Sequence, residues 1–373
     1  MWTSERIRAI LLWMSRRSLL PLLLVTACQA APAGSSGFSA TPSGTTAAAS
    51  SSGESSTGTS SGGASGTSAA AGSTNNSTGS DGTAETTSPI LDVGSSADIG
   101  DGKPVGCKGK IDFLFVISRD AAMKLAQTRL LDAFPKFIAT IQAKFKDFDY
   151  HIMVVDGDQG WGHEPCNEDC GQWFCEANDY PCDLLGLVTE CDETLGAGNV
   201  FGAGYNATNK PCAIASGKRY LTRDQADLVE TFACIAQLGS SGRGWIGEAL
   251  TAAMGPALGW PGACNEGFLR DDALLMVTLV AANWDQEGKP NGSAGTPEEW
   301  YQAVLAGKKG DPESVVMFSL LDPNCPPQDR TCQLVKMFPY SSVEYVGVAD
   351  YGPAFDTATD LIEAACAGFE PPG

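Results

Sequence analysis

The chain has 373 residues, 13 cysteines and a formal charge of −20. From Cys28 onward it holds 20 basic and 43 acidic residues, and no lysine or arginine lies between Arg17 and Lys103. This acidic balance, without a basic stripe, argues against nucleic acid as a partner and against electrostatic binding to an anionic membrane surface. Thirteen cysteines are also too many for a reducing cytosol unless they bind metal.

The first 27 residues are predicted to be a lipoprotein signal peptide. Residues 1–17 are basic, and residues 18–27 form an apolar run that is too short for a membrane-spanning helix of about 20 apolar residues. The run ends in Val-Thr-Ala before Cys28, which resembles the lipobox of bacterial lipoproteins. The resemblance implies that Cys28 is lipidated; an ordinary cleaved signal peptide is the alternative. Gln29 stands where inner-membrane members carry Asp, so the expected location is the outer membrane or cell surface of a Gram-negative bacterium.

Residues 28–100 are predicted to be a disordered tether. Of the 60 positions from Ala31 to Ile90, 50 are Ser, Thr, Gly or Ala, and the only aromatic residue is Phe38. Such a composition cannot bury enough apolar area to offset the entropy lost on ordering. The tether is expected to hold the rest of the chain clear of the membrane, with the lipid as the only membrane attachment.

Residues 101–373 are predicted to form one domain of the α/β class. Apolar runs of strand length predict strands at 111–117, 150–155, 273–281, 314–321 and 343–348. Apolar residues at three- and four-residue spacing predict helices at 123–145, 223–237, 245–258, 297–306 and 353–367. This alternation indicates a doubly wound, mostly parallel sheet with helices on both faces, whose binding crevice lies at the carboxyl ends of the strands.

A cysteine-rich insert at about 156–213 interrupts this alternation. It holds six cysteines among Gly, Asn, Asp and Pro, with His163 nearby, so a zinc cluster is one interpretation. However, no C-x-x-C pair occurs, the signal peptide directs the chain to an oxidising compartment, and an even number of cysteines remains without Cys28, which favours disulfides. The cysteines predicted to form six bridges are Cys107, Cys166, Cys170, Cys175, Cys182, Cys191, Cys212, Cys234, Cys264, Cys325, Cys332 and Cys366. Plausible pairs are Cys325 with Cys332 and Cys234 with Cys264.

The search for catalytic groups finds little. His151 lies in a predicted strand, where a packed core histidine is expected, and neither histidine has a nucleophile identifiable by motif. Residues 242–247 match G-x-G-x-x-G, but a helix is predicted before them, whereas a dinucleotide loop follows a strand. The acidic pairs at 156/158 and 271/272 do not continue into an EF-hand loop and are expected to be solvated carboxylates.

Five pieces of the chain resemble the von Willebrand factor A-like (vWA) domains of surface lipoproteins of the myxobacterial type. In order they are KIDFLFVI, FDYHIMVVDGD, ACIAQLGSSG, NEGFLRDDALLMVTLV and ADYGPAFDTATDLIEAAC, and the similarity covers about residues 107–370. The resemblance implies a six-stranded, mostly parallel sheet flanked by helices. It also implies that protein ligands bind through a metal at the carboxyl-end crevice. In that family the metal is held by D-x-S-x-S after the first strand, a Thr in a second loop and an Asp after the fourth strand.

The metal motif of that family is degenerate here. The first loop reads SRDAA at 118–122, which lacks the leading Asp and the last Ser, and Ala282 stands where the later Asp would be. Each alanine removes an oxygen ligand, and Arg119 would repel a cation. The remaining candidate metal ligands are Ser118, Asp120, Ser240 and Asp285. One alternative is a weak Mg or Ca site; the favoured interpretation is no cofactor, for instance with Arg119 paired with Asp120 in place of the ion.

Two functions from different classes follow. The first is a non-enzymatic, lipid-anchored adhesion module whose partner is an unknown protein or an envelope polymer. The second is a secreted hydrolase that uses Asp156, Asp158 and Asp285 as acid and base. A structural role in the envelope is a further alternative. The candidate contact residues of the binding module, some of which are expected to be plain packing, are Trp161, Trp173, Phe174, Tyr180, Trp245 and Trp284.

Overall fold

The computed structural model describes residues 107, 109–162, 166, 170, 175, 182–289 and 292–369. The chain divides into two units, Met1–Thr87 and Ser88–Gly373, and every described residue belongs to the second unit. The predicted signal peptide with Cys28 and the predicted tether lie outside the described residues, as do His163 and the candidate contact residues Trp173, Phe174 and Tyr180.

A six-stranded sheet forms the centre of the domain, in the order β3-β2-β1-β4-β5-β6. Its strands are β1 (Lys110–Ile117), β2 (Asp149–Asp156), β3 (Leu221–Thr222), β4 (Leu274–Val280), β5 (Val315–Leu321) and β6 (Tyr340–Tyr345). Neighbouring strands are parallel except for β3, which pairs antiparallel with β2 at one edge. The predicted mostly parallel α/β sheet is confirmed, and only the two-residue strand β3 is absent from the prediction.

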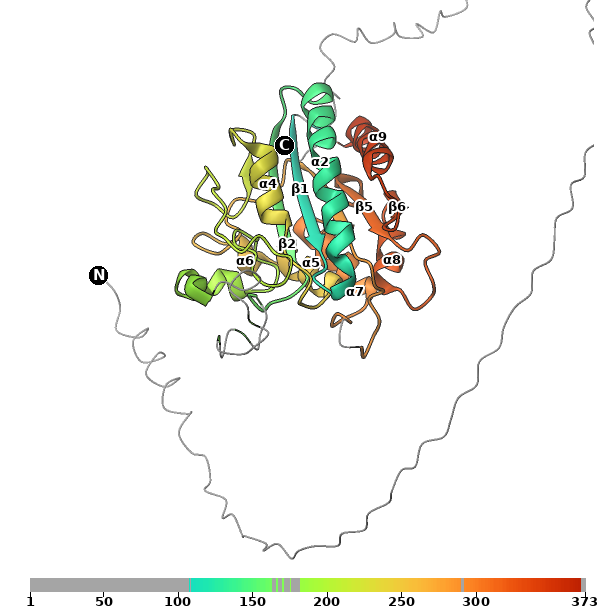
Figure 1. Cartoon of the computed structure of the whole chain (residues 1–373). Coiled ribbons are helices and arrows are strands. Elements are labelled where there is room, and N and C mark those ends of the chain that lie inside the picture. Colours follow the sequence, from blue (N-terminus) through green and yellow to red (C-terminus); the bar gives the residue numbers. More distant parts are fainter. Residues whose placement is uncertain are drawn as a thin grey trace, which may run out of the picture. The chain divides into compact units, whose positions relative to one another are not determined.

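Helices cover both faces of this sheet. They are α2 (Lys124–Lys144), α4 (Leu228–Ala236), α5 (Ile246–Met254), α6 (Pro256–Gly259), α7 (Pro297–Gly307), α8 (Arg330–Val335) and α9 (Gly352–Gly368). Helices α2, α4 and α9 share one buried core, and Figure 1 shows α2 along β1 with α4 and α9 on either side. Helices α5, α7 and α8 share the core on the other face. No helix among the described residues is long and apolar enough to cross a membrane.

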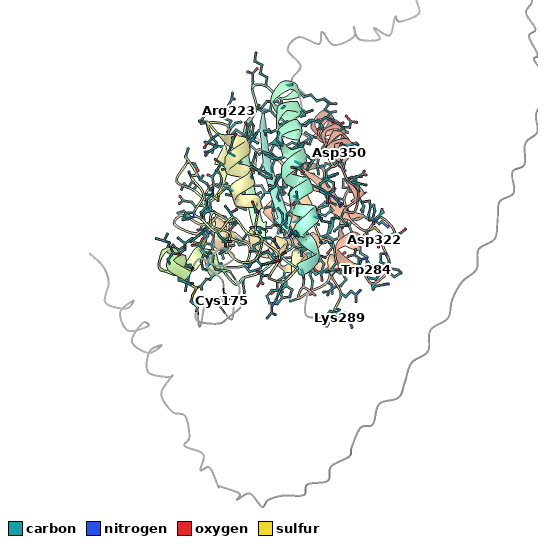
Figure 2. All side chains as sticks on the ribbon, viewed as in Figure 1. Cys175, Arg223, Trp284, Lys289, Asp322 and Asp350 are labelled. Atoms are coloured by element: carbon teal, nitrogen blue, oxygen red, sulfur yellow. A yellow bond between two sulfur atoms is a disulfide. The ribbon has the colours of Figure 1, made fainter. Side chains whose placement is uncertain are left out.

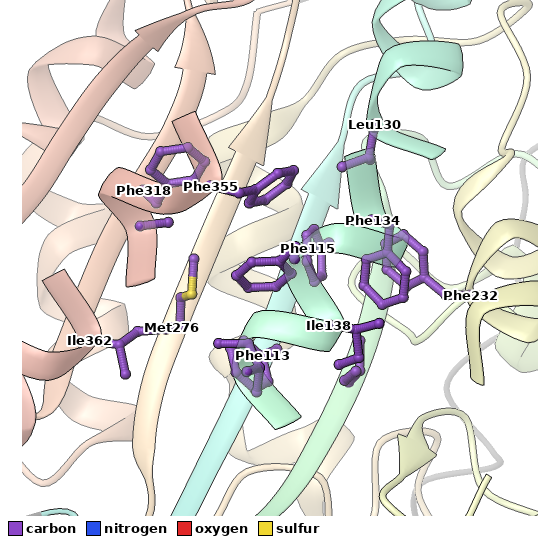
Figure 3. Packing of buried hydrophobic residues seen from close by; sticks show 14 of the residues in the cluster. Phe113, Phe115, Leu130, Phe134, Ile138, Phe232, Met276, Phe318, Phe355 and Ile362 are labelled. Carbon is purple, nitrogen blue, oxygen red and sulfur yellow. The ribbon is translucent and has the colours of Figure 1, made fainter. Parts of the chain in front are cut away.

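Strand β1 shows why both faces are covered. Phe113 and Phe115 enter the core beneath α2, α4 and α9, whereas Leu114 and Val116 enter the core beneath α5, α7 and α8. All four side chains are at most 1% exposed, as expected for a central strand of a parallel sheet. Figure 3 shows Phe115 beside Phe134 of α2, with the ring centroids 6.4 Å apart.

The helix predicted at 245–258 is interrupted at Gly255. This residue is extended (φ −69°, ψ 140°), and Pro256 begins the separate helix α6. A residue before proline is disfavoured in the helical region, whereas proline is well suited to the first turn of a helix. The same sequence feature therefore ends α5 and starts α6. Helix α8, which has only six residues, shows no periodicity from which it could be predicted.

All twelve cysteines predicted to form bridges do so. The six disulfides are Cys107–Cys366, Cys166–Cys175, Cys170–Cys182, Cys191–Cys264, Cys212–Cys234 and Cys325–Cys332. The expected pair of Cys325 with Cys332 is present, but the pair of Cys234 with Cys264 is wrong. Each of these two cysteines instead bonds to the insert, which the fold brings beside α4 and beside the loop before β4.

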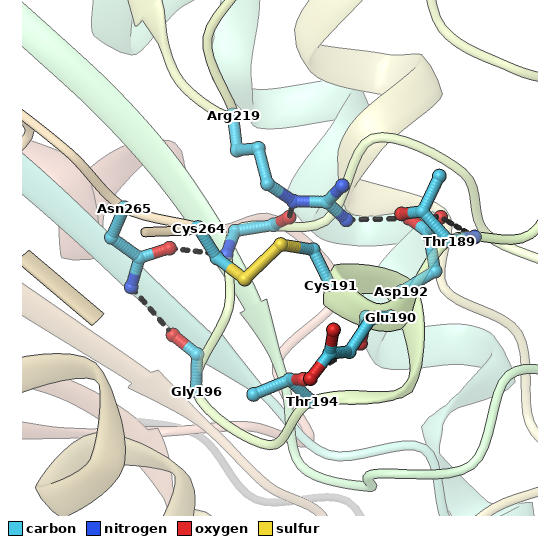
Figure 4. The surroundings of a disulfide bond; sticks show 10 residues. Thr189, Glu190, Cys191, Asp192, Thr194, Gly196, Arg219, Cys264 and Asn265 are labelled. Carbon is cyan, nitrogen blue, oxygen red and sulfur yellow. Dashed lines mark hydrogen bonds and ion pairs between the residues drawn. A yellow bond between two sulfur atoms is a disulfide. The ribbon is translucent and has the colours of Figure 1, made fainter. Parts of the chain in front are cut away.

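Next to the disulfide between Cys191 and Cys264, two hydrogen bonds of Asn265 also attach the insert to the domain, as Figure 4 shows. Asn265 is 3% exposed and donates its Nδ2–H to the carbonyl of Gly196 at 2.8 Å. Its Oδ1 accepts the N–H of Gly198 at 2.9 Å. One buried amide thus satisfies both a donor and an acceptor of the insert backbone, which holds the insert against the domain.

Candidate functional site

The loops that follow β1, β2, β4, β5 and β6 meet at one edge of the sheet. These strands are parallel, so their carboxyl ends point in the same direction. In α/β proteins this edge is the usual place for a ligand. Ser118 and Asp120 follow β1, Asp156 ends β2 and Asp158 follows it, and Asp285 follows β4. Ser240 lies in the loop between α4 and α5, which meets the loop after β1 where the N–H of Gly242 donates to the carbonyl of Arg119 at 2.9 Å.

Ser118 and Asp120, directly after β1, are engaged with each other. The hydroxyl of Ser118 donates to Asp120 Oδ2 at 2.8 Å, and the N–H of Ala122 donates to Asp120 Oδ1 at 2.9 Å. Asp120 is the N-cap of the short 3-10 helix η2 (Ala121–Met123). Both side chains are buried, so their oxygens hold the turn that leads from β1 into α2.

Arg119 is directed away from Asp120 and is only 1% exposed. Its Nη1 pairs with Asp156 Oδ2 at 2.8 Å and donates to the carbonyl of Gly160 at 2.6 Å, while its Nη2 donates to the carbonyl of Gly162 at 2.6 Å. The expected pairing of Arg119 with Asp120 is therefore wrong. The reason is geometric: Asp156 ends β2 in register with the last residue of β1, and Asp120 is already used as a helix cap.

The carboxylates of the β2 loop are also committed to internal contacts. Loss of solvation raises the pKa of Asp156 to about 7, opposed by Arg119 and reinforced by Asp158. Asp158 accepts the N–H of Gly160 at 3.1 Å and the N–H of Arg243 at 2.8 Å. The cavity beside them has a volume of about 10 Å³, which is room for about one water molecule but not for a substrate.

Ser240 and Asp285 belong to two further networks. Ser240 Oγ accepts the Nδ2–H of Asn206 at 2.7 Å. Asp285, which is 2% exposed, pairs with Arg330 Nη2 at 2.8 Å and accepts the hydroxyl of Ser293 at 2.5 Å. An arginine on Asp285 cancels the negative charge that a cation would need.

These donors do not fit a divalent cation. A hard cation commonly takes six oxygen ligands, whereas oxygens of Asp120, Ser240 and Asp285 already accept hydrogen bonds from the protein. Within the ranges that the structure describes, no group of three or more His, Cys, Asp or Glu side chains could hold a metal ion. The carboxylates of the second acidic pair also have lysine partners. Asp271 pairs with Lys309 at 2.8 Å, and Asp272 pairs with Lys110 at 2.5 Å.

The G-x-G-x-x-G stretch at 242–247 follows α4 and opens α5, so the helix expected before it is confirmed. Its glycines allow close approach between loops. A Cβ at Gly244 would lie 2.6 Å from Ser118 Oγ, and one at Gly242 would lie 2.7 Å from Asp158 Oδ2. A side chain at either position would have to displace Ser118 or Asp158, so glycine lets this backbone lie against the loops after β1 and β2.

The predicted contact aromatics differ in exposure. Trp161 is 3% exposed and donates its indole N–H to the carbonyl of Phe201 at 2.8 Å, so it packs the insert instead of facing a ligand. Trp245 is partly buried beneath Arg243, whose Cζ lies 4.5 Å from the ring centroid. Trp284, in contrast, is 36% exposed.

Trp284 lines a cleft of about 800 Å³ between the loops that follow β4, β5 and β6. Tyr345, the last residue of β6, lines the same cleft and is 50% exposed. The polar side chains of the lining are Asn283, Gln286, Lys289, Asp322 and Asn324. Figure 2 shows Trp284, Lys289 and Asp322 at the same end of the domain. This volume is within the range of ligand pockets in proteins.

Contacts within the cleft hold both aromatic rings in place. The indole N–H of Trp284 donates to Asp322 Oδ2 at 3.2 Å, and Asp322 Oδ1 accepts the Nδ2–H of Asn324 at 2.8 Å. Tyr345 lies over Gly347, because a Cβ at position 347 would be 2.3 Å from the Cζ of the tyrosine ring. Asp322 and Tyr345 are not among the sequence-predicted site residues. Asp322 directly follows the strand predicted at 314–321, and that carboxyl-end position is the signal that could have indicated it.

The fold and the cleft define a disulfide-rich α/β protein with an aromatic crevice at the carboxyl edge of its sheet. No protein-family model and no curated protein matches the chain. Two solved structures of proximal thread matrix protein 1 from the mussel byssus are similar over 70% of this chain, with TM-scores of 0.35 and 0.33 and sequence identities of 14% and 12%. The alignment spans 47% of the length of those chains. A similarity at this level carries no functional argument.

Proposed function

We propose that this protein is a non-enzymatic binding module of the cell envelope, anchored through a lipid on Cys28, that holds a protein or an envelope polymer in the cleft between Trp284 and Tyr345. The observation that carries the proposal is the exposure of these two rings, 36% and 50%, in one cleft at the carboxyl edge. Large aromatic side chains contribute a disproportionate share of binding energy.

Features outside the cleft support an extracytoplasmic location. Six disulfides are expected in an oxidising compartment and are rare in the cytosol. The lipobox-like sequence before Cys28 supports lipid attachment at the outer membrane or cell surface. We infer the binding role partly from the sequence resemblance to vWA domains, and binding here would be independent of metal because Arg119 and Arg330 neutralise two of the carboxylates at the crevice.

The same geometry favours binding over hydrolysis. General acid and base groups must reach a substrate, with two carboxyl groups on either side of the bond that breaks. Asp156 and Asp285 each pair with an arginine, and Asp158 accepts hydrogen bonds from backbone N–H groups of the loops. None of the three carboxylates lines the 800 Å³ cleft.

The test is cosedimentation of the full chain with isolated cell envelopes, in a Cys28→Ser background so that a lipid does not contribute. We expect Trp284→Ala to reduce binding at least about tenfold, and chelation of divalent cations to leave binding unchanged. Trp260→Ala is the matched control, because Trp260 is 63% exposed but lies outside the cleft. Equal binding by the Trp284 and Trp260 variants would refute the proposal.

A further inference from the structure

The side chains of the cleft have a composition that suits one chemical class of ligand. Two aromatic faces, Trp284 and Tyr345, are combined with three carboxamides and with one carboxylate and one ammonium group of opposite charge. Aromatic faces pack well against flat C–H surfaces, and carboxamides and carboxylates offer donors and acceptors to hydroxyl groups. A pyranose ring presents both kinds of surface, with C–H bonds on its faces and hydroxyls around its edge.

We propose that the cleft binds a polysaccharide, with sugar rings packed on Trp284 and Tyr345 and their hydroxyls bonded to the surrounding amides. This inference rests on the proposed function and names the ligand class of the same site. A protein ligand is the less suitable occupant, because the fully desolvated centre of a protein interface is depleted in Lys and Asp, whereas here Lys289 and Asp322 line the cleft together with the aromatic rings.

Both rings have a contact within the cleft before a ligand arrives, Trp284 through a hydrogen bond and Tyr345 through packing on a glycine. Asp322 orients Trp284 through the indole N–H at 3.2 Å, and Asn324 in turn holds Asp322 through both its backbone N–H at 3.0 Å and its side-chain amide at 2.8 Å. Close packing on Gly347 leaves no room beneath the ring of Tyr345. A ring that a hydrogen bond orients in advance, as in Trp284, loses less conformational entropy on binding, which raises affinity for a repeating ligand with weak individual contacts.

The test uses affinity electrophoresis of the full chain with Cys28→Ser, in gels that contain envelope polysaccharide prepared by exhaustive protease digestion. We expect the mobility to fall relative to a gel without polysaccharide. The apparent Kd should rise at least about tenfold for Trp284→Ala and Tyr345→Ala. It should rise less for Trp284→Phe, which keeps the planar face, and not at all for Trp260→Ala.

Periodate and protease treatments separate this inference from the proposed function. Periodate cleaves the vicinal diols of sugars, so prior oxidation of the polysaccharide should abolish retardation in the gel, whereas protease digestion of intact envelopes should leave cosedimentation unchanged. Envelope binding that depends on Trp284 but is lost after protease digestion would identify a protein ligand. That result would overturn the proposal of a polysaccharide ligand but not the proposal of a binding module. The absence of retardation by the unoxidised polysaccharide would also overturn the proposal of a polysaccharide ligand. Envelope binding that does not depend on Trp284 would overturn both proposals.

Discussion

Arg119 joins three backbone segments at the carboxyl edge of the sheet. It follows β1, neutralises Asp156 at the end of β2, and donates to the carbonyls of Gly160 and Gly162 in the loop beyond. A guanidinium group offers five N–H donors in a rigid plane, which suits simultaneous contacts with one carboxylate and several carbonyls. A single arginine therefore supplies both the positive charge and the geometric constraint that hold these loops.

At this scale we predict that Arg119→Met lowers the free energy of unfolding by about 3–5 kcal/mol. Methionine retains much of the aliphatic volume but leaves the carboxylate of Asp156 without its partner, and removal of one member of a buried pair is costly. Urea denaturation followed by circular dichroism measures the change. Arg243→Met is the control, because Arg243 is exposed in a neighbouring loop and its replacement removes only the contact of the guanidinium with the ring of Trp245, which should cost less than about 1 kcal/mol. Similar losses in both variants would contradict the role assigned to Arg119.

Helices α5 and α7 approach each other closely through Gly247. A Cβ at this position would lie 2.3 Å from Cε2 of Trp300, which is 1% exposed. The indole of Trp300 donates to the carbonyl of Ala294 at 2.8 Å, and the Cζ of Arg330 lies 5.0 Å from its ring centroid. Arg330 also pairs with Asp285, next to Trp284, so the packing of α5 on α7 continues into the loop that forms one wall of the cleft.

Gly247→Ala is predicted to destabilise the domain by about 1–3 kcal/mol, because the added methyl group displaces the Trp300 ring from a close-packed core. Thermal unfolding measures the loss. Gly259→Ala is the matched control: it lies at the end of α6, nothing approaches a Cβ there within 4 Å, and alanine has the higher helix propensity. If the two substitutions shift the midpoint equally, the contact between α5 and α7 does not depend on this glycine.

For the molecule as a whole, the disulfides differ greatly in the length of chain that they close. Cys107 precedes β1 and bonds to Cys366 of α9 across a sequence separation of 259, so it joins the two ends of the domain. Cys325 and Cys332 have a sequence separation of only 7 and close only the loop that leads into α8. In the chain-entropy description, the longer closure restricts the unfolded state more strongly.

Removal of Cys107–Cys366 by a double serine substitution is therefore predicted to cost about 3 kcal/mol more than removal of Cys325–Cys332. Guanidinium unfolding of the two variants gives the comparison, with thiol titration of the unfolded chains to confirm that the other five bridges have formed. A larger loss from the short bridge would show that it acts through native packing and not through chain entropy.

The elements with strong apolar patterns are those that could be predicted from the sequence. The run IDFLFVI, predicted as a strand at 111–117, forms β1 at Lys110–Ile117. The residues from Met123 onward, whose apolar spacing predicts a helix, form α2 at Lys124–Lys144. The two-residue strand β3 and the six-residue helix α8 are too short to show a period, and tertiary packing holds them. Trp284 and Trp161 are both predicted as candidate contact residues, of which some are expected to be plain packing, and Trp161 is one that packs, because a sequence does not show which tryptophan is buried.

The sequence by itself determined the α/β class, the alternation of buried strands and helices, and the use of twelve cysteines for bridges, because these depend on local periodicity and on counting. Only the tertiary structure decided that Cys191 bonds to Cys264, that Arg119 pairs with Asp156, and that Trp284, Asp322 and Tyr345 share a cleft. Each of these depends on residues tens of positions apart that meet at the edges of a folded sheet. Partner choice among charges and thiols is set by which loops the strand order places side by side.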